Sequence, residues 1–258
     1  MLRNYWYIAC SSRQLAESPH GAQVLDQEIV VFRDSSAKPH ALLNRCCHRG
    51  VELSLGKVIE GTIACRYHGW RYAGNGQCVH IPSLSSGRGI PEGVGVPRYP
   101  CVEQDGYVWV WVDKREGNPA RPPRIPQFAN YRWHQGSMPM QCGVLKGIEN
   151  NLDWCHPYFA HPWTHGQFFN TRFRGFRDQS YEMRRSEQGL VVFTPVTANE
   201  EEPIPEQPLI KLTFDLPNRV RAEFWKPFHL VIVMHFVPTG NNTCRFEWLI
   251  SKLLPIGS

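Results

Sequence analysis

Four side chains able to bind metal stand in two short motifs in the first third of the chain. The motif C-x-H-R-G spans Cys46–Gly50, and the motif C-x2-H-G-W spans Cys65–Trp70. Two thiolates and two imidazoles can bind one zinc ion tetrahedrally, or they can hold a [2Fe–2S] cluster. The four donor residues are Cys46, His48, Cys65 and His68.

The way the four donors divide distinguishes the two metal centres. In a Rieske cluster two Cys bind one iron and two His bind the other, and two loops that each supply one Cys and one His satisfy that division. The two segments resemble the Rieske motif of ring-hydroxylating oxygenases, with Cys47 at a position where Pro is common. We expect Cys47 to be a bystander. Zinc is the alternative, but it leaves the HRG and YHGW surroundings of the donors unexplained.

A second group of possible ligands follows in the pattern D-x2-H-x4-H, formed by Asp153, His156 and His161. The resemblance implies that His156 and His161 are two of the three ligands of a mononuclear non-haem iron. A 2-His-1-carboxylate set of this kind leaves coordination positions open for O2 and substrate. The resemblance also implies that Asp153 is a bridging carboxylate, which links an iron-ligating His to a cluster-ligating His of a neighbouring subunit.

Helix geometry permits this second site only if the helix is interrupted. The best helix candidate covers Gly147–Ala160. At about 100° per residue, Asp153 and His156 would lie about 60° apart, whereas His156 and His161 would lie about 140° apart. Pro157 disfavours helix at the residue before it and removes a backbone donor. We therefore expect a break near Pro157 that brings His161 round towards His156.

The elements that must position the first motif look like a small antiparallel β-domain. Strand patterns cover Val24–Asp34, Ala41–Arg45, Ile63–Tyr72 and Gln77–Ile81, and Gly74-Asn75-Gly76 predicts a hairpin turn. The run YVWVWVD from Tyr107 alternates Val and aromatic residues as a strand does. A Pro- and Arg-rich connector follows at residues 115–128. The sequence thus predicts two domains, a Rieske domain at residues 1–115 and a catalytic iron domain at residues 116–258.

The second half predicts β-runs after the helix candidate. They lie at Leu190–Pro195, Leu209–Leu216, Val220–Trp225, Leu230–Val237 and Cys244–Leu254. The predicted fold class is therefore α+β, and the resemblance implies a helix-grip (START-like) catalytic domain with an antiparallel sheet. In the family, the carboxylate ligand of the iron sits on a helix after the last strand, and the chain stops where that helix would be approached. We nominate no third ligand and expect a C-terminally truncated fragment, or else a natively short chain with an incomplete iron site.

Composition sets the remaining limits. The 258 residues are 42% hydrophobic and 12% aromatic, as in a folded globular protein, and the formal net charge of +5 is too small to indicate nucleic-acid binding. Nine cysteines in a chain of this length, without a signal-peptide pattern, predict a cytoplasmic protein rather than a secreted disulfide scaffold. The apolar run from Phe228 is too short to span a bilayer.

The resemblance implies the oxygenase component of a Rieske non-haem iron system. An NAD(P)H-dependent reductase, in some systems with a ferredoxin, would supply electrons to the cluster. The iron would then use O2 to hydroxylate or O-demethylate a small, often aromatic, organic substrate. A homotrimer is implied as well, because electrons in the family cross between subunits. The alternative is a Rieske electron-transfer protein with a degenerate, non-catalytic second domain.

Overall fold

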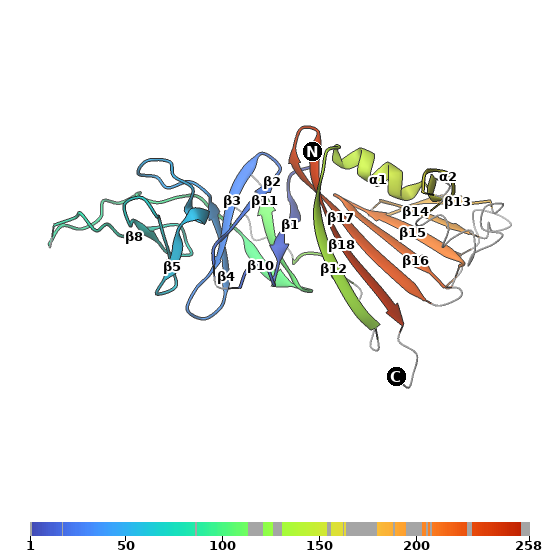
Figure 1. Ribbon diagram of the computed structural model, residues 1–258, viewed down its shortest axis with the longest axis horizontal. Helices are drawn as coiled ribbons and strands as arrows, with labels where there is room; N and C mark the ends of the chain where they lie inside the picture. Colours follow the sequence, from blue (N-terminus) through green and yellow to red (C-terminus); the bar gives the residue numbers. More distant parts are fainter. Residues whose placement is uncertain are drawn as a thin grey trace. The chain divides into compact units, whose positions relative to one another are not determined.

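Antiparallel strands dominate both halves of the chain. Each half forms its own compact unit, Met1–Ile125 and Pro126–Ser258, coloured blue to green and green to red in Figure 1. A computed structural model of the chain describes residues 2–16, 18–85, 87–112, 121–125, 131–153, 156–161, 163, 180–187, 189–194, 203, 204, 206, 208–225 and 229–253.

The first unit contains three small antiparallel sheets. The first has the order β1 (Tyr5–Ser11), β11 (Tyr107–Val112), β10 (Cys101–Gln104). The second has the order β2 (His20–Val24), β3 (Gln27–Arg33), β4 (Pro39–Leu43), β9 (Arg98–Tyr99). The third has the order β5 (Lys57–Ile59), β6 (Thr62–Ala64), β7 (Arg71–Tyr72), β8 (Cys78–His80), and the short 3-10 helix η1 (Leu53–Leu55) precedes it.

The alternating Val and Trp of the YVWVWV run explain the central strand of the first sheet. β11 lies between β1 and β10, with Val108 and Val110 fully buried. Trp6 of β1 lies opposite Trp111, and the two ring centroids are 5.7 Å apart. The strand predicted from this run is confirmed as β11. Its successive side chains point to opposite faces of the sheet, and they are apolar on both faces because both faces are buried.

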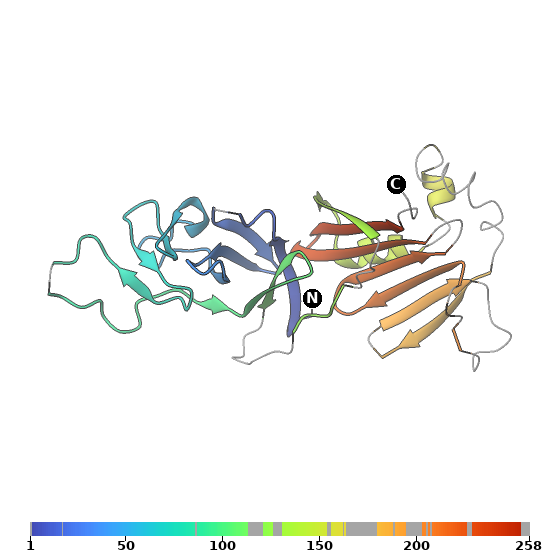
Figure 2. The ribbon, with the colours of Figure 1, turned by 90° about the horizontal axis from the view of Figure 1, so that it is seen from below.

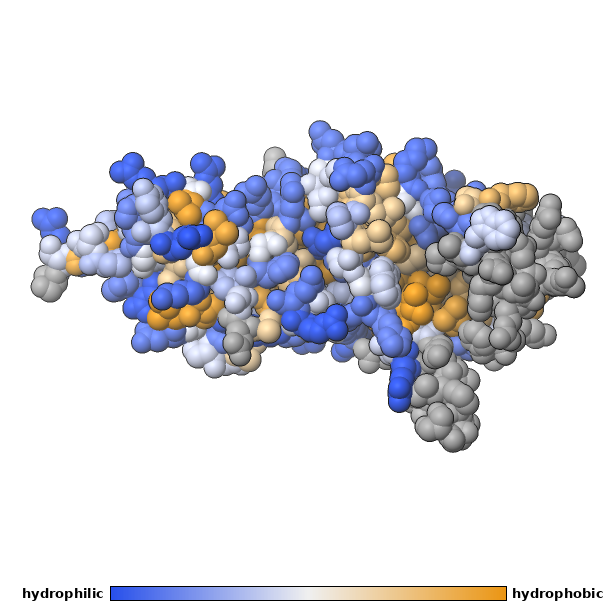
Figure 3. Space-filling view, in the orientation of Figure 1, coloured by the Kyte–Doolittle hydropathy of each residue, from blue (hydrophilic) through white to orange (hydrophobic). Residues whose placement is uncertain are grey.

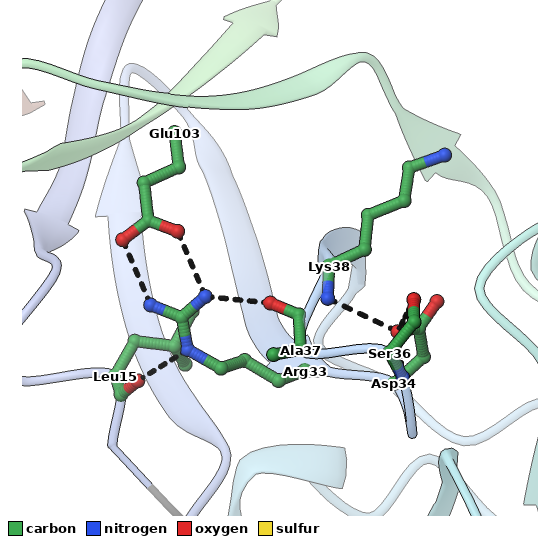
Figure 4. Close-up of polar contacts among 7 residues, drawn as sticks. All are labelled: Leu15, Arg33, Asp34, Ser36, Ala37, Lys38 and Glu103. Atoms are coloured by element: carbon green, nitrogen blue, oxygen red, sulfur yellow. Dashed lines mark hydrogen bonds and ion pairs between the residues drawn. The ribbon is translucent and has the colours of Figure 1, made fainter.

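Arg33 ties the second sheet to the first. Its guanidinium donates two parallel hydrogen bonds to the carboxylate of Glu103 in β10, at 2.8 and 2.9 Å, and two more to the backbone oxygens of Leu15 and Ala37 (Figure 4). The Arg33 partner holds the pKa of Glu103 below its usual range. Because a bidentate Arg–carboxylate pair fixes orientation as well as distance, the contact sets how β3 and β10 meet.

The predicted strand Ile63–Tyr72 is wrong as a single element. The structure divides it into β6 and β7, which pair with each other as Ile63 with Tyr72 and Ala64 with Arg71. The residues between them form a tight loop that contains Cys65 and His68. The predicted turn at Gly74-Asn75-Gly76 does lie between β7 and β8, and Gly76 has a positive φ of 87°.

The second unit is built on one antiparallel sheet of seven strands. Figures 1 and 2 show this sheet in green to red. Its strand order is β12 (Tyr131–Met140), β18 (Thr243–Leu253), β17 (Leu230–Gly240), β16 (Arg219–Phe224), β15 (Ile210–Asp215), β14 (Gly189–Thr194), β13 (Glu182–Ser186). The five strands predicted after residue 190 are confirmed as β14 to β18. β12 and β13 were not predicted.

One face of this sheet carries the apolar core of the unit. Val144 and Ile148 of helix α1 (Val144–Leu152) pack against a cluster from the central strands. The buried members of that cluster on the sheet are Ile210, Leu212, Val220, Ala222, Phe224, Met234, Phe236 and Cys244. Gly147 lies on the buried side of the helix and contacts the ring of Phe236. The expected α+β class, an antiparallel β-domain followed by a sheet that holds a helix, is confirmed.

The opposite face of the same strands carries a buried polar row. Asp215, Arg219, His235 and Glu247 are consecutive cross-strand partners on β15, β16, β17 and β18, and all four are buried. Arg219 forms an ion pair with Asp215 at 2.8 Å. Burial and the nearby charge of Arg219 lower the pKa of His235 to about 3. The imidazole of His235 is therefore neutral in the folded chain at neutral pH.

The predicted helix Gly147–Ala160 is in fact two helices. α1 ends at Leu152, with Asp153 as its extended C-terminal cap, and α2 (His156–Ala160) follows. The interruption thus precedes His156, and Pro157 lies inside α2. Pro is compatible with that position because the first turn of a helix has no internal acceptor for its missing N–H.

The two units meet within the predicted connector, at Ile125–Pro126. The ranges 1–115 and 116–258 stay predictions as domain assignments. Among the residues described, no helix is both long enough and apolar enough to cross a membrane.

Candidate metal centres

The first cluster loop is a closed turn that begins at Cys46. The Cys46 amide donates to the carbonyl of Val51, and the Gly50 amide donates back to the carbonyl of Cys46, both at 2.9 Å. Gly50 has a φ of 74°, a conformation that favours glycine because it has no Cβ. This explains the glycine in the HRG sequence. The turn places His48 at its tip.

The second cluster loop repeats the same hydrogen-bond pattern. The Cys65 amide donates to the carbonyl of Trp70 at 2.8 Å, and the Gly69 amide donates to the carbonyl of Cys65 at 3.0 Å. Gly69 has a φ of 71°. The second loop therefore closes over the same number of residues as the first. Its imidazole, that of His68, is one position further along.

These paired turns separate sulfur from nitrogen. Cys46 and Cys65, at the base of the loops, are 3% and 4% exposed, and their thiols interact. His48 and His68 lie nearer the surface, with ring centroids 4.6 Å apart. Two sulfur donors on the inner side and two nitrogen donors on the outer side match a cluster whose two irons have different ligands.

Burial shifts the pKa values of two candidate ligands, Cys65 and His48. Burial raises the pKa of the Cys65 thiol, and the neighbouring Cys46 adds to the rise. Burial lowers the pKa of His48, and the nearby His68 lowers it further. Both shifts favour the neutral forms of these side chains. A bound metal reverses this preference for the thiols, because metal ligands must be deprotonated.

Aromatic residues hold the loops from both sides. The ring of Trp70 stacks on His48, with centroids 4.6 Å apart and planes inclined by 7°. The hydroxyl of Tyr72 lies 3.0 Å from the Cys46 sulfur and 3.3 Å from the Cys47 sulfur. Burial of the phenol, together with these two cysteines, raises the pKa of Tyr72. Tyr72 therefore remains a hydrogen-bond donor beside the candidate ligand Cys46.

The surface around the loops is open to solvent on the His side. Tyr67 and Leu55 are 62% and 52% exposed, and Val79 of β8 is also exposed. Figure 3 shows apolar patches in orange among hydrophilic residues over the part of the first unit that contains β5 and β8. A centre near this surface is accessible to an electron donor or acceptor.

The second group of ligands lies where α1 gives way to α2. His156 is the first residue of α2 and His161 follows its last residue, and their ring centroids are 5.5 Å apart. Nδ1 of His156 lies 2.6 Å from the backbone oxygen of Asp153. That hydrogen bond fixes the proton on Nδ1, so Nε2 is the nitrogen available to a metal. The structure thus brings together the two imidazoles that an unbroken helix would keep apart.

Comparison with known proteins identifies the first centre. A Rieske [2Fe-2S] domain matches residues 5–100, which include both loops. This part of the chain is a Rieske domain. Proteins similar to the chain include the oxygenase component of dicamba O-demethylase and an iron-sulfur subunit of a putative toluene-4-sulfonate monooxygenase system.

Two relatives show the extent of the sequence similarity. Chlorophyllide a oxygenase from Chlamydomonas reinhardtii is 39% identical over 62% of this chain and 24% of its own length. The oxygenase component of dicamba O-demethylase from Stenotrophomonas maltophilia is 34% identical over 62% of this chain and 48% of its own. The chain therefore spans about half, or less, of these relatives.

Solved structures extend the similarity of the chain to its second unit. Dicamba monooxygenase bound to dicamba matches 98% of this chain and 78% of its own, with a TM-score of 0.79 and 23% identity. NdmA from Pseudomonas putida CBB5 with caffeine matches 99% of this chain and 76% of its own, with a TM-score of 0.76 and 23% identity. These matches show that both units share the fold of the oxygenases. The two expected cofactors, a [2Fe–2S] cluster and a mononuclear iron, agree with this family.

The described residues place no third candidate ligand beside His156 and His161. In the ranges that the structure describes, no three His, Cys, Asp or Glu side chains are grouped so as to hold one metal ion. The downstream acids Asp215, Glu223 and Glu247 lie on strands and form ion pairs with Arg219, Arg221 and Arg245. These ion pairs engage each of the three carboxylates within the sheet.

Two residues at the centres of the chain were not predicted. The sequence predicts only that Tyr72 lies in a strand. Its distance along the chain from Cys46 does not indicate that β7 brings the Tyr72 hydroxyl to the Cys46 sulfur. Asn150 was placed only within a helix, yet its amide nitrogen lies 3.4 Å from Nε2 of His156. The spacing of Asn150 and His156 could not reveal this contact, because it depends on the interruption between α1 and α2.

Proposed function

We propose that the protein is the oxygenase component of a Rieske non-haem iron system, which hydroxylates or O-demethylates a small organic substrate with O2. Two features support the proposal: the Rieske domain at residues 5–100 and the oxygenases among the relatives. The names of those relatives include an O-demethylase and a dioxygenase. We place the protein in the cytoplasm as a homotrimer, supplied with electrons by an NAD(P)H-dependent reductase, in some systems through a ferredoxin.

The proposed cluster ligands are Cys46, His48, Cys65 and His68. A [2Fe–2S] cluster supplies single-electron transfer at this position, and His ligands on one iron raise its reduction potential above that of an all-Cys cluster. The chain's own part is to hold the thiols in the interior and the imidazoles towards solvent. The stack of Trp70 on His48 fixes one imidazole plane. The Tyr72 hydroxyl lies 3.0 Å from the Cys46 sulfur, where it would donate a hydrogen bond to a ligating thiolate.

The proposed iron ligands are His156 and His161. A mononuclear iron with two His and one carboxylate supplies open positions for O2 and substrate. The chain contributes the orientation of His156, because the backbone oxygen of Asp153 accepts its Nδ1 proton. We assign the Asp153 side chain, which is exposed, to the relay between this site and the cluster of a neighbouring subunit.

One observation carries the proposal beyond electron transfer. His156 and His161 approach to 5.5 Å between ring centroids, on either side of a helix of five residues. A domain that only transferred electrons through the cluster would have no need of this pair. These two imidazoles, one at the start of α2 and one just after its end, are therefore the feature that favours an oxygenase.

Metal analysis of the purified protein tests the assignment. We expect two irons with two acid-labile sulfides from the cluster, and a third iron after anaerobic addition of Fe(II). His156→Ala and His161→Ala should each abolish the third iron and leave the cluster absorbance unchanged. His80→Ala, which removes an exposed imidazole from β8, is the matched control and should retain all three. Binding of the third iron by the double His156→Ala, His161→Ala variant would refute the site.

A second candidate function is electron transfer by a Rieske domain joined to a non-catalytic second domain. The observation that favours it is the engagement of Asp215, Glu223 and Glu247 in ion pairs on the sheet. The same metal analysis separates the two functions. A stable content of two irons and two sulfides, with no third iron at any Fe(II) concentration, would favour the electron-transfer protein.

A further inference from the structure

The Tyr72 hydroxyl lies between two cysteine sulfurs that differ in their surroundings. Cys46 is a proposed cluster ligand and is 3% exposed, and its sulfur lies 3.0 Å from the hydroxyl. Cys47 is a free and exposed residue, and its sulfur lies 3.3 Å from the same hydroxyl. The sequence alone suggests a bystander at position 47. The structure instead gives its thiol a defined partner.

The chemistry of Cys46, Tyr72 and Cys47 determines which group donates each hydrogen bond. A ligating Cys46 is a thiolate, so it can only accept a hydrogen bond. The Tyr72 hydroxyl carries one proton and can donate it to Cys46 while its oxygen accepts another. The Cys47 thiol has a proton to donate, and the Tyr72 oxygen lies within its reach. The resulting chain runs from Cys47 S–H to the Tyr72 oxygen, and from Tyr72 O–H to the Cys46 sulfur.

We propose that Cys47 is a positioning residue that raises the reduction potential of the cluster by acting through Tyr72. Donation from Cys47 orients the phenol proton towards Cys46 and polarises it. Linked hydrogen bonds strengthen one another by roughly 10–30% per bond. A stronger hydrogen bond to a cluster sulfur favours the reduced cluster, which carries the additional negative charge. The proposal rests on the assignment of Cys46 as a cluster ligand and does not depend on oxygenase activity.

A redox titration of the full chain with its cluster tests this role. Cluster reduction is followed by its visible absorbance against a dye of known potential, at one fixed pH. We compare the wild type with Cys47→Ala, Cys47→Ser and Tyr72→Phe, and with the double variant Cys47→Ala, Tyr72→Phe. Iron and sulfide are measured in every sample, so a failure to assemble the cluster is recognised independently of the potential.

The expected effects form a double-mutant cycle. Tyr72→Phe should reduce the equilibrium constant for cluster reduction about tenfold, because it removes a hydrogen bond to a charged group. Cys47→Ala should reduce it about twofold, because it removes only the polarising partner. In the Tyr72→Phe background, Cys47→Ala should have no further effect. Cys47→Ser should restore the potential towards that of the wild type, since its hydroxyl can also donate.

Two results would overturn the proposal. An unchanged potential in Cys47→Ala, with a full cluster, would return Cys47 to a bystander. An equal decrease in the presence and absence of the Tyr72 hydroxyl would show that Cys47 acts on the cluster directly. Cys101→Ala, which removes a free thiol from another sheet of the same unit, is the control and should leave the potential unchanged. Should Cys47→Ala fail to assemble, the Cys47→Thr and Cys47→Val pair provides the same comparison, because the two side chains have nearly the same shape and only Thr can donate a hydrogen bond.

Discussion

Gly147 of α1 lies directly against the ring of Phe236 in β17. A Cβ at position 147 would lie 2.5 Å from Cδ1 of that ring and 2.6 Å from Cε1. Phe236 is fully buried, so its ring has no free space into which it could move. This contact lets α1 approach the sheet closely, and α1 ends at Leu152, shortly before the helix that begins with His156.

Gly147→Ala should therefore destabilise the second unit. In an exposed helix, alanine in place of glycine stabilises by about 1 kcal/mol. At this position we expect the opposite sign, a loss of about 1–3 kcal/mol from overpacking. Urea unfolding followed by the fluorescence of the second unit measures the change. Lys146→Ala, at an exposed position of the same helix, should be within about 0.5 kcal/mol of the wild type, and a stabilised Gly147→Ala would contradict the contact.

Neighbouring cysteines should differ sharply in their effect on cluster content. Cys46→Ala removes a buried proposed ligand and should yield protein without labile sulfide or visible colour. Cys47→Ala removes the adjacent exposed thiol and should retain two irons and two sulfides per chain. The comparison isolates ligation, because both changes remove one sulfur from the same loop. Equal loss of the cluster in both variants would contradict the assignment of Cys46, rather than Cys47, as the ligand in this loop.

Acid should destabilise the fold through His235. Its pKa is about 3 in the folded chain and about 6.5 in an unfolded one. Between those values the unfolded chain binds a proton that the folded chain does not. The contribution is therefore complete above about pH 6.5 and declines as the pH falls, on the order of 1 kcal/mol per pH unit.

The pH dependence of urea unfolding between pH 7 and pH 5 checks this expectation, because most carboxylates stay ionised in that range. His235→Gln should lower stability at both pH values but make the pH dependence shallower. His80→Gln, at an exposed position, should leave the pH dependence as in the wild type. An unaltered slope in His235→Gln would mean that other groups cause the acid sensitivity.

Asp153→Asn should separate metal binding from electron relay. The substitution keeps the backbone oxygen that orients His156, so both metals should remain bound. The rate at which O2 oxidises the reduced cluster should fall by about 10- to 100-fold, the range found for outer-shell partners of metal sites. Stopped-flow absorbance measures that rate. Glu149→Gln, which removes a nearby exposed carboxylate of α1, is the control, and an unimpaired rate in Asp153→Asn would exclude the relay.

Regular strands were predictable where side-chain alternation alone determines them. The YVWVWV run gave β11, and the apolar runs after residue 190 gave β14 to β18. β12 was missed because Gly136 and Pro139 interrupt its pattern. It forms nonetheless, because pairing with β18 extends over all ten of its residues. That partner lies more than a hundred residues away, and local patterns carry no information about it.

The candidate sites were predictable in their ligand types but not in their surroundings. The spacing of Cys46, His48, Cys65 and His68 identifies the cluster, because few other centres need that set. The approach of His156 to His161 is expected from a break near Pro157. The structure instead places the interruption before His156, with Pro157 inside α2, and α2 ends just before His161. The hydroxyl of Tyr72 reaches the Cys46 sulfur through the pairing of β6 with β7, which only the folded chain reveals.

Each unit closes by pairing its earliest strand with its latest, β1 with β11 and β12 with β18. During synthesis on the ribosome, neither sheet can be completed until its final strand has emerged. The cluster loops lie wholly between the strands that close the first unit, so that half can mature and receive its metal while the rest of the polypeptide is still being translated. The half with the paired imidazoles must wait for residues 243–253, which gives the nascent protein a fixed order of assembly.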